Sequence, residues 1–259
     1  MGTFLFDKII FGPVQSRRLG VSLGINLLPV NKKICTFDCI YCECGFNGEQ
    51  AGIITKMPTR EEVKTELKQV LTKMQDDKQE PNVITFAGNG EPTMHKDFES
   101  IIDDTIELRN SFFPEARIAV LSNATLIHKE SVVNALKRID DNILKLDSGL
   151  EETIKTLDQP NPGFTLPNLT NNLIQFKGQL TIQTMFVTGE YNGVKIDNTS
   201  SEDVSAWLKI ITEVKPKSVM IYTIERDTPV KGLTKVALEK LKEIASEVEQ
   251  LGIPTQVSG

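Results

Sequence analysis

Three cysteines within one short segment constrain this chain more than any other feature of its sequence. Cys35, Cys39 and Cys42 follow the spacing C-x-x-x-C-x-x-C, and an aromatic residue, Tyr41, directly precedes the last of them. Thiolates are the usual protein ligands of iron–sulfur clusters, and one short loop can curl around such an object. We therefore expect the loop to hold three corners of a four-iron four-sulfur (4Fe-4S) cluster. The fourth iron then stays open to a small chelating molecule.

Two other uses of these cysteines fit the sequence less well. A zinc site normally takes four ligands in two pairs, and the remaining candidates, Cys44, His95 and His128, make no second pair. A disulfide framework is typical of secreted chains, whereas this sequence shows neither a signal peptide nor a long apolar segment. We therefore expect a reduced, cytoplasmic protein in which Cys44 is a bystander thiol.

The composition indicates a folded, acidic protein without a membrane segment. Hydrophobic residues make up 39% of the chain and charged residues 25%, and the net charge is −6. Extended contact with nucleic acid depends largely on neutralised phosphates, so this charge argues against it. The 259 residues fit one domain, residues 1–259, which is a size at which α/β barrels occur.

Strand-like and helix-like segments alternate along most of the chain. Apolar runs predict strands at 21–28, 82–87, 117–121, 142–146, 180–186 and 218–223, with a short edge strand at 254–257. Helical spacing predicts helices from a capping box at Thr59 onward and at 97–110, 129–138, 169–176, 201–214 and 235–251. Such alternation favours parallel strands joined by right-handed crossovers. We expect an α/β fold, a partial (β/α)6 barrel. A flat doubly wound sheet is the alternative, although cysteines replace its phosphate fingerprint.

Loops that follow barrel strands lie at the carboxyl ends, where active sites form, so the cysteine loop is expected at the barrel mouth. The second predicted strand runs into Gly88, Asn89, Gly90 and Glu91. Glycines let the backbone approach a ligand closely, and a carboxylate can receive an ammonium group. This segment therefore predicts a seat for the amino group of a bound ligand.

Lys145 and Asp147 share one face of the fourth predicted strand, because side chains alternate along a strand with a period of two. A charged pair in a barrel mouth must be paired internally or contact a ligand. Two arginines before the first strand, Arg17 and Arg18, can fold over the mouth to meet a carboxylate or phosphate, or can be ordinary surface residues. Further side chains near strand ends are expected to complete the wall of the site: Gln183, Met185, Tyr222 and Glu225.

The cysteine spacing with Tyr41 resembles the signature of the radical SAM superfamily. The stretches GPVQSRRLG, AGNGEPTMH, VLSNATL, LKLDSG, IQTMF and MIYTIERDTP are similar to a compact subgroup of it, which is related to the enzyme that makes the tricyclic base of wyosine in tRNA. The superfamily has a Gly-Gly-Glu motif where this chain has Asn89, Gly90 and Glu91. The resemblance implies the six-unit partial barrel, the radical SAM core.

The resemblance also implies the cofactors, a 4Fe-4S cluster with three cysteine ligands and S-adenosyl-L-methionine. The cluster would pass one electron to the sulfonium, and the resulting 5′-deoxyadenosyl radical would take a hydrogen atom from the substrate. Tyr41 would pack near the adenine, residues 88–91 would hold the methionine amine, and Ser122 and Asn123 would hold the ribose. Ser122 and Asn123 are also common turn residues after a strand. We expect Lys145 on the cofactor and Asp147 on the substrate.

The sequence carries no flavodoxin-like extension and no second cysteine cluster, so the resemblance implies an external one-electron donor of the flavodoxin or ferredoxin type. We expect an enzyme acting on a small molecule or a modified nucleobase, for example a deazapurine as in the queuine-cleaving lyases. A tRNA base-modifying enzyme is the alternative, and the acidic chain favours the smaller substrate. A non-enzymatic iron–sulfur electron carrier or sensor is a third hypothesis.

Overall fold

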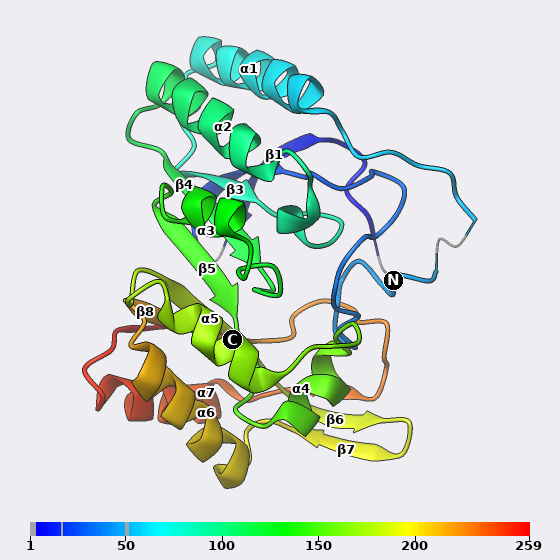
Figure 1. The fold of residues 1–259 in the computed structure, drawn as a ribbon, viewed down its shortest axis with the longest axis vertical. Coiled ribbons are helices and arrows are strands. Elements are labelled where there is room, and N and C mark those ends of the chain that lie inside the picture. The colour runs from blue at the N-terminus through cyan, green and yellow to red at the C-terminus, as the bar shows by residue number, and fades with distance from the viewer. Residues whose placement is uncertain (1–3, 17, 50–51) are drawn as a thin grey trace.

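The computed structural model describes residues 4–16, 18–49 and 52–259 (Figure 1). Its strands form one ten-stranded sheet in the order β1-β2-β3-β4-β5-β6-β8-β10, with β7 and β9 both pairing to β6. Six strands run parallel as immediate neighbours. They are β2 (Gly20–Ile25), β3 (Val83–Phe86), β4 (Arg117–Ser122), β5 (Asp141–Lys145), β6 (Thr181–Tyr191) and β8 (Ser218–Thr223). The predicted partial barrel is therefore confirmed.

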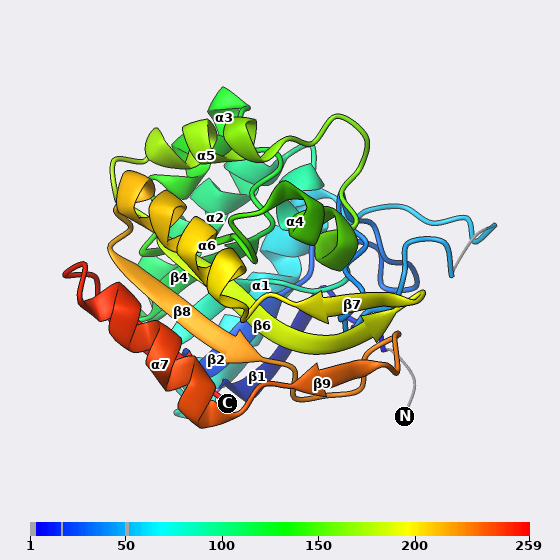
Figure 2. The same ribbon diagram turned by 90° about the horizontal axis from the view of Figure 1, so that it is seen from below.

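Helices connect these strands and cover the outer face of the curved sheet (Figure 2). They are α1 (Arg60–Asp76), the short 3₁₀ turn η1 (Pro92–Met94), α2 (Phe98–Phe112), α3 (Glu130–Leu136), α4 (Glu151–Asp158), α5 (Leu166–Ile174), α6 (Ser201–Val214) and α7 (Leu238–Glu249). The predicted capping box of α1 is confirmed, because Thr59 and Glu62 each accept a hydrogen bond from the other's backbone N–H. In the described part of the chain, no helix is long and apolar enough to cross a membrane.

The two edges of the sheet extend the six-stranded core. At one edge, β1 (Ile10–Ser16) pairs antiparallel with β2 and was not predicted. Its Gly12 and Pro13 suggested a turn, but proline is tolerated in an edge strand because no neighbour needs its missing N–H. At the other edge, the predicted final strand is confirmed as β10 (Thr255–Ser258), parallel to β8.

Sequence analysis missed three elements around the end of β6. Strand β6 continues into a hairpin with β7 (Val194–Asp197), and β9 (Leu233–Lys235) pairs with it on the other side (Figure 2). The intervening Asn192 and Gly193 are a common two-residue hairpin turn, which is the signal that was overlooked. Helix α4 was also missed, because its eight residues were grouped with the irregular, proline-containing segment that follows.

The sheet buries apolar residues on its outer face and leaves room on its inner face. Along β3, Ile84 and Phe86 pack outward in the main core, while Val83 joins a small inner cluster with Leu19. Inner-facing residues nearer the carboxyl ends of the first strands are small: Ser22, Gly24, Thr85 and Ala87. Because these side chains do not fill the interior, a cavity remains inside the barrel.

Candidate active site

The cysteine loop is held in shape by one asparagine. The side-chain oxygen of Asn47 accepts a hydrogen bond from the backbone N–H of Cys35 at 3.0 Å. Its amide nitrogen donates to the carbonyl oxygens of Cys35 and Phe37, at 3.2 and 3.1 Å. Asn47 therefore bridges the start of the loop from outside the cysteine motif. Sequence analysis missed this residue, and its only signal was the Asn-Gly pair that marks a turn.

The glycine-rich segment after β3 is joined directly to the cysteine loop. Ile34, next to Cys35, forms a parallel bridge with Gly90. The N–H of Ile34 donates to the carbonyl oxygen of Asn89 at 3.0 Å, and the N–H of Glu91 donates to Ile34 at 3.1 Å. A side chain at Gly90 would collide with the Ile34 carbonyl oxygen. The two motifs therefore form one structural unit.

A buried lysine places a positive charge among the cysteines, which sequence analysis did not anticipate. The ammonium group of Lys33 is enclosed and donates to the carbonyl oxygen of Gly45 at 2.7 Å and to Asp38 at 3.1 Å. Burial lowers the pKa of Lys33, but negative charge on the nearby Cys42, Cys35 and Cys39 raises it further, so the net shift is upward. Lys33 therefore stays protonated and stabilises thiolates around it.

The cysteines do not share one environment. A hydrogen bond from the Cys44 thiol and the charge of Lys33 lower the pKa of Cys42 to about 6, against the effect of burial. Burial and the carboxylate of Glu91 raise the pKa of Cys35 to about 12. In the absence of other ligands, Cys42 is thus the most easily ionised of the three cysteines of the motif.

The donor set fits a 4Fe-4S cluster. All four cysteines are free thiols, and the three of the motif come from one loop. Among the residues described, no three His, Cys, Asp or Glu side chains converge on a point as a single metal ion would require. A cubane cluster needs no such convergence, because each thiolate binds its own iron atom.

Tyr41 anchors a buried polar network next to the cysteines. Its hydroxyl group donates to Asp147 and accepts from the ammonium group of Lys145, and it lies 3.2 Å from Asp158. Lys145 also pairs with Asp147 at 2.5 Å and with Asp158 at 3.3 Å. Lys145 and Asp147 thus lie side by side, and Asp158, at the end of α4, was not identified from the sequence.

This network holds two carboxylates for one lysine. Burial lowers the pKa of Lys145, but the charges of Asp147 and Asp158 raise it to a net value well above its usual range. Burial raises the pKa of Asp158 to about 7, and the neighbouring Asp147 adds to this while Lys145 opposes it. Lys145 therefore stays protonated and is shared between the two carboxyl groups.

Glu91 is fully engaged within the protein. Its carboxylate accepts hydrogen bonds from the backbone and hydroxyl of Thr93, from the Ser122 hydroxyl at 2.8 Å and from the Asn123 backbone at 2.7 Å. Burial raises the pKa of Glu91, and these hydrogen bonds act against that shift. The Asn123 amide in turn donates toward the Cys35 sulfur at 3.4 Å. The three residues assigned to ligand contacts thus also connect β4 to the cysteine loop.

Asn89 is also enclosed by protein contacts. Its side chain bonds the backbone of Phe6 and the carbonyl oxygen of Pro29, at 2.8 to 2.9 Å. Gly88, with a φ angle of +140°, lies against Asn26, so a side chain there would collide with it. Of the four residues 88–91, it is Gly88 that borders the barrel cavity.

A cavity of about 870 Å³ occupies the barrel mouth. Six residues of the wall were assigned to the site from the sequence: Tyr41, Cys42, Gly88, Met185, Tyr222 and Glu225. Glu225 stands at the exposed rim and pairs with Lys235 at 2.6 Å. Arg18, one of the two arginines considered for the mouth, also lines the cavity, whereas Arg17 lies outside the described residues.

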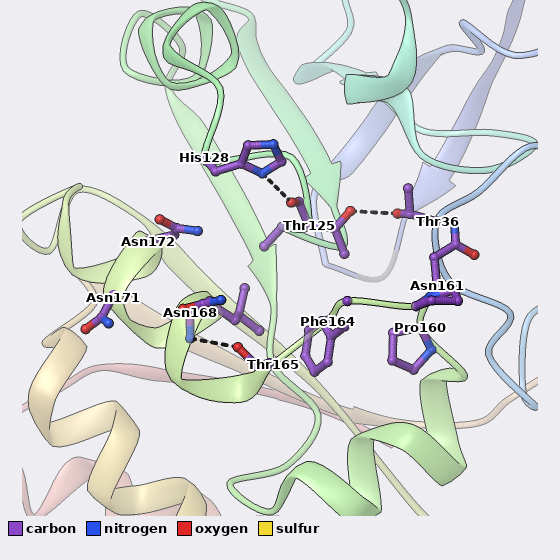
Figure 3. Close-up of a pocket in the computed structure, with 14 residues that line it drawn as sticks. Thr36, Thr125, His128, Pro160, Asn161, Phe164, Thr165, Asn168, Asn171 and Asn172 are labelled. Atoms are coloured by element: carbon purple, nitrogen blue, oxygen red, sulfur yellow. Dashed lines mark hydrogen bonds between the residues drawn. The ribbon is translucent and has the colours of Figure 1, made fainter.

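A second cavity of about 500 Å³ lies on the other side of the cysteine loop (Figure 3). Its wall includes Thr36 of that loop, whose hydroxyl contacts the Thr125 hydroxyl at 2.6 Å. Phe164 and Pro160 face it from the segment between α4 and α5, and His128 lies above it (Figure 3). Polar, uncharged side chains dominate this cavity, and sequence analysis did not anticipate it.

Two relatives match nearly the whole chain. A protein of Brachyspira hyodysenteriae named GTPase Obg is 31% identical over 246 residues, which cover 92% of this chain but 34% of that protein. A UPF0026 protein of Methanocaldococcus jannaschii is 28% identical over 240 residues, covering 91% of this chain and 70% of that protein. The chain thus spans about a third of the first relative, whose name describes the whole of a longer protein.

Solved structures share the fold. A radical SAM methyltransferase from Sphaerobacter thermophilus superimposes with a TM-score of 0.67 at 14% identity, covering 92% of this chain and 65% of that one. Archaeal TYW1 superimposes with a TM-score of 0.53 at 13% identity, covering 88% of this chain and 71% of that one. These similarities agree with the predicted partial barrel.

The family comparison agrees with the site geometry. Residues 33–163, about half of the chain, match the family described as the radical SAM superfamily. This region begins at Lys33, includes the three cysteines and the glycine-rich segment, and continues past Asp158. The chain therefore belongs to the radical SAM superfamily, whose enzymes use a 4Fe-4S cluster and S-adenosyl-L-methionine.

Proposed function

We propose that this protein cleaves S-adenosyl-L-methionine reductively and acts on a small molecule or a modified nucleobase such as a deazapurine. The observation that carries the proposal is the cavity of about 870 Å³ shared by Tyr41, Cys42 and Gly88. Small-molecule sites usually occupy about 300–1,000 Å³, so this volume suits small ligands. A tRNA substrate would need an open, positively charged approach, whereas the net charge is −6.

When bound, the cluster and S-adenosyl-L-methionine supply one-electron reduction and hydrogen-atom abstraction. The protein's own residues then have three tasks. Cys35, Cys39 and Cys42 hold the cluster while Lys33 balances the thiolate charge. Gly88 lets the backbone approach the cofactor closely.

Lys145 and Asp147 position the two ligands against each other. Lys145 meets the negative groups of the cofactor, and Asp147 contacts the substrate. Because the reacting atoms must be held a few ångströms apart, side chains that touch both ligands contribute by orientation. The electron comes from an external donor of the flavodoxin or ferredoxin type, and the enzyme works in the cytoplasm.

The test uses protein reconstituted anaerobically with iron and sulfide. With a strong one-electron reductant, we expect slow formation of 5′-deoxyadenosine and methionine even without substrate. Cys42→Ala is expected to lose both the cluster and this activity, while Cys44→Ala retains both and serves as the matched control. Absence of 5′-deoxyadenosine from protein that holds a full cluster would contradict the proposal and favour an electron carrier or sensor.

The substrate class is tested in the same assay. Deazapurine bases are expected to accelerate 5′-deoxyadenosine formation, and total tRNA is expected to leave it unchanged. Acceleration by tRNA alone would instead favour a tRNA-modifying enzyme and contradict the small-substrate part of the proposal.

A further inference from the structure

Arg18 reaches the barrel cavity with part of its hydrogen-bonding capacity unused. Its guanidinium carbon lies 4.4 Å from the centre of the Tyr222 ring, and both residues line the cavity of about 870 Å³. The Nη1 atom of Arg18 is buried and has no hydrogen-bond partner among the described residues. A guanidinium group is always charged and prefers two oxygen acceptors in its plane, so this N–H group lacks its usual partner.

The backbone around Arg18 keeps the side chain in this place. The N–H of Arg18 donates to the Ser16 hydroxyl at 3.3 Å, and its carbonyl oxygen accepts from the Gln256 amide at 3.0 Å. Gln256 belongs to β10, so this contact joins the two edges of the curved sheet. The next residue, Leu19, is buried in the inner apolar cluster. Arg18 is therefore a structured part of the barrel interior.

A second unused donor lies on the same inner face. The amide nitrogen of Gln183 is buried and also has no partner among the described residues. Gln183 and Met185 share one face of β6, and Met185 is registered with Tyr222 on β8. Of the two residues, Arg18 is the one that lines the cavity, and its unpaired N–H group is complementary to a hydrogen-bond acceptor. The positive charge of Arg18 selects an anionic one.

Arg226, a second arginine at the same cavity, differs from Arg18 because it has a carboxylate partner. Arg226 lines the same cavity, but its guanidinium pairs with Glu43 at 2.6 Å and its side chain is 65% exposed. Its charge is already used within the protein. Arg18 instead stacks on the ring of Tyr222. Burial raises the pKa of the Tyr222 hydroxyl, while the charges of Lys145 and Arg18 lower it. The ring of Tyr222 thus orients Arg18 without neutralising it.

We propose that Arg18, oriented by the ring of Tyr222, binds an oxyanion of the substrate, either a carboxylate or a phosphate. This inference rests on the proposed function in one respect, namely that the substrate enters this cavity. It adds a chemical requirement, because the substrate must carry a negatively charged group that Arg18 can bind. Within the proposed class, it selects a small molecule or a nucleobase derivative that carries a carboxylate or a phosphate.

The test measures binding of two simple anions, inorganic phosphate and benzoate, to the reconstituted protein at constant ionic strength. Broadening of the phosphate ³¹P resonance and of the benzoate proton resonances reports binding without reductant or S-adenosyl-L-methionine. Arg18→Gln is expected to weaken binding of at least one probe about tenfold. Arg18→Lys keeps the positive charge without the planar guanidinium group, so we expect its affinity for the probe to lie between those of the wild type and Arg18→Gln. Arg226→Gln is the matched control and is expected to bind as the wild type does.

Loss of phosphate binding alone identifies a phosphate group, and loss of benzoate binding alone identifies a carboxylate. Equal binding by wild type and Arg18→Gln, or no binding of either probe to the wild type, would overturn the proposal. Fluorescence of the single tryptophan, Trp207, checks that each variant is folded. Because no cleavage reaction is involved, a negative result here leaves the test of the proposed function unaffected.

Discussion

Gly90→Ala tests whether the glycine-rich segment holds the cysteine loop in place. A Cβ atom at Gly90 would lie 1.8 Å from the Ile34 carbonyl oxygen, and the φ angle of Gly90 is +139°. An L side chain at such an angle costs about 1–3 kcal/mol. The collision also separates two hydrogen bonds, from Ile34 to Asn89 and from Glu91 to Ile34, each contributing about 0.5–1.5 kcal/mol. The expected loss is therefore about 2–6 kcal/mol, a large part of a typical domain's stability of about 5–15 kcal/mol.

Gly252→Ala provides the matched control. Gly252 has a φ angle of +79° with no atom within 4 Å of an added Cβ, so only backbone strain of about 1–2 kcal/mol is expected. Urea unfolding of both variants can be followed through Trp207, which is buried and packs edge-on against Phe186 at 5.5 Å. Iron content after reconstitution should fall in Gly90→Ala and stay normal in Gly252→Ala. Equal destabilisation of the two variants with full iron content would refute this account of Gly90.

Three further predictions address charged groups. Lys145→Ala is expected to weaken S-adenosyl-L-methionine binding, which equilibrium dialysis measures. Asp147→Asn is expected to stop substrate turnover, measured by product analysis, while cluster and cofactor remain bound. Wild-type values in both variants would contradict the assigned roles. Lys33→Met removes a buried positive charge beside three thiolates, so we expect less iron uptake and a lower cluster reduction potential in an EPR-monitored titration. The guanidinium of Arg60 lowers the pKa of Asp104, so the pair stabilises the folded state above the unfolded pKa of about 3.8 and loses this effect as pH falls through the lower folded value. Urea unfolding should therefore show Asp104→Asn less stable than wild type at pH 7, with the difference shrinking as pH falls through the lowered folded pKa of Asp104.

Local sequence patterns were enough to predict much of the fold. The capping box at Thr59 satisfies backbone groups within one turn of chain, so it needs no information from elsewhere. The six strands carry apolar runs because parallel strands are buried on both faces. Strand β1 escaped prediction because its pattern is that of an exposed edge, with Gly12 and Pro13 in its middle.

The sequence predicted those parts of the candidate site that depend on residues close together in the chain. The spacing of Cys35, Cys39 and Cys42 encodes a loop that can surround a cluster, and alternation along a strand placed Lys145 beside Asp147. Where a side chain's partners come from other elements, the sequence held no comparable signal.

Two residues illustrate that limit. Lys33 becomes a buried charge only when Gly45 and Asp38 fold around its ammonium group. Glu91 looked free to receive a ligand amine, but the carboxyl end of β4 and the turn η1 supply hydrogen-bond donors to its carboxylate.

The amino-acid sequence by itself determined the cysteine loop, the alternation of strands and helices and the charge of the chain, because these depend on neighbours within a few residues. The curvature of the sheet determined which residues distant in the chain come into contact inside the barrel. It brings Arg18, before the first parallel strand, against Tyr222 on the last, and it joins Arg18 to Gln256 at the far edge. Contacts between residues this distant in the chain depend on the twist and register of every intervening strand, which no local pattern specifies.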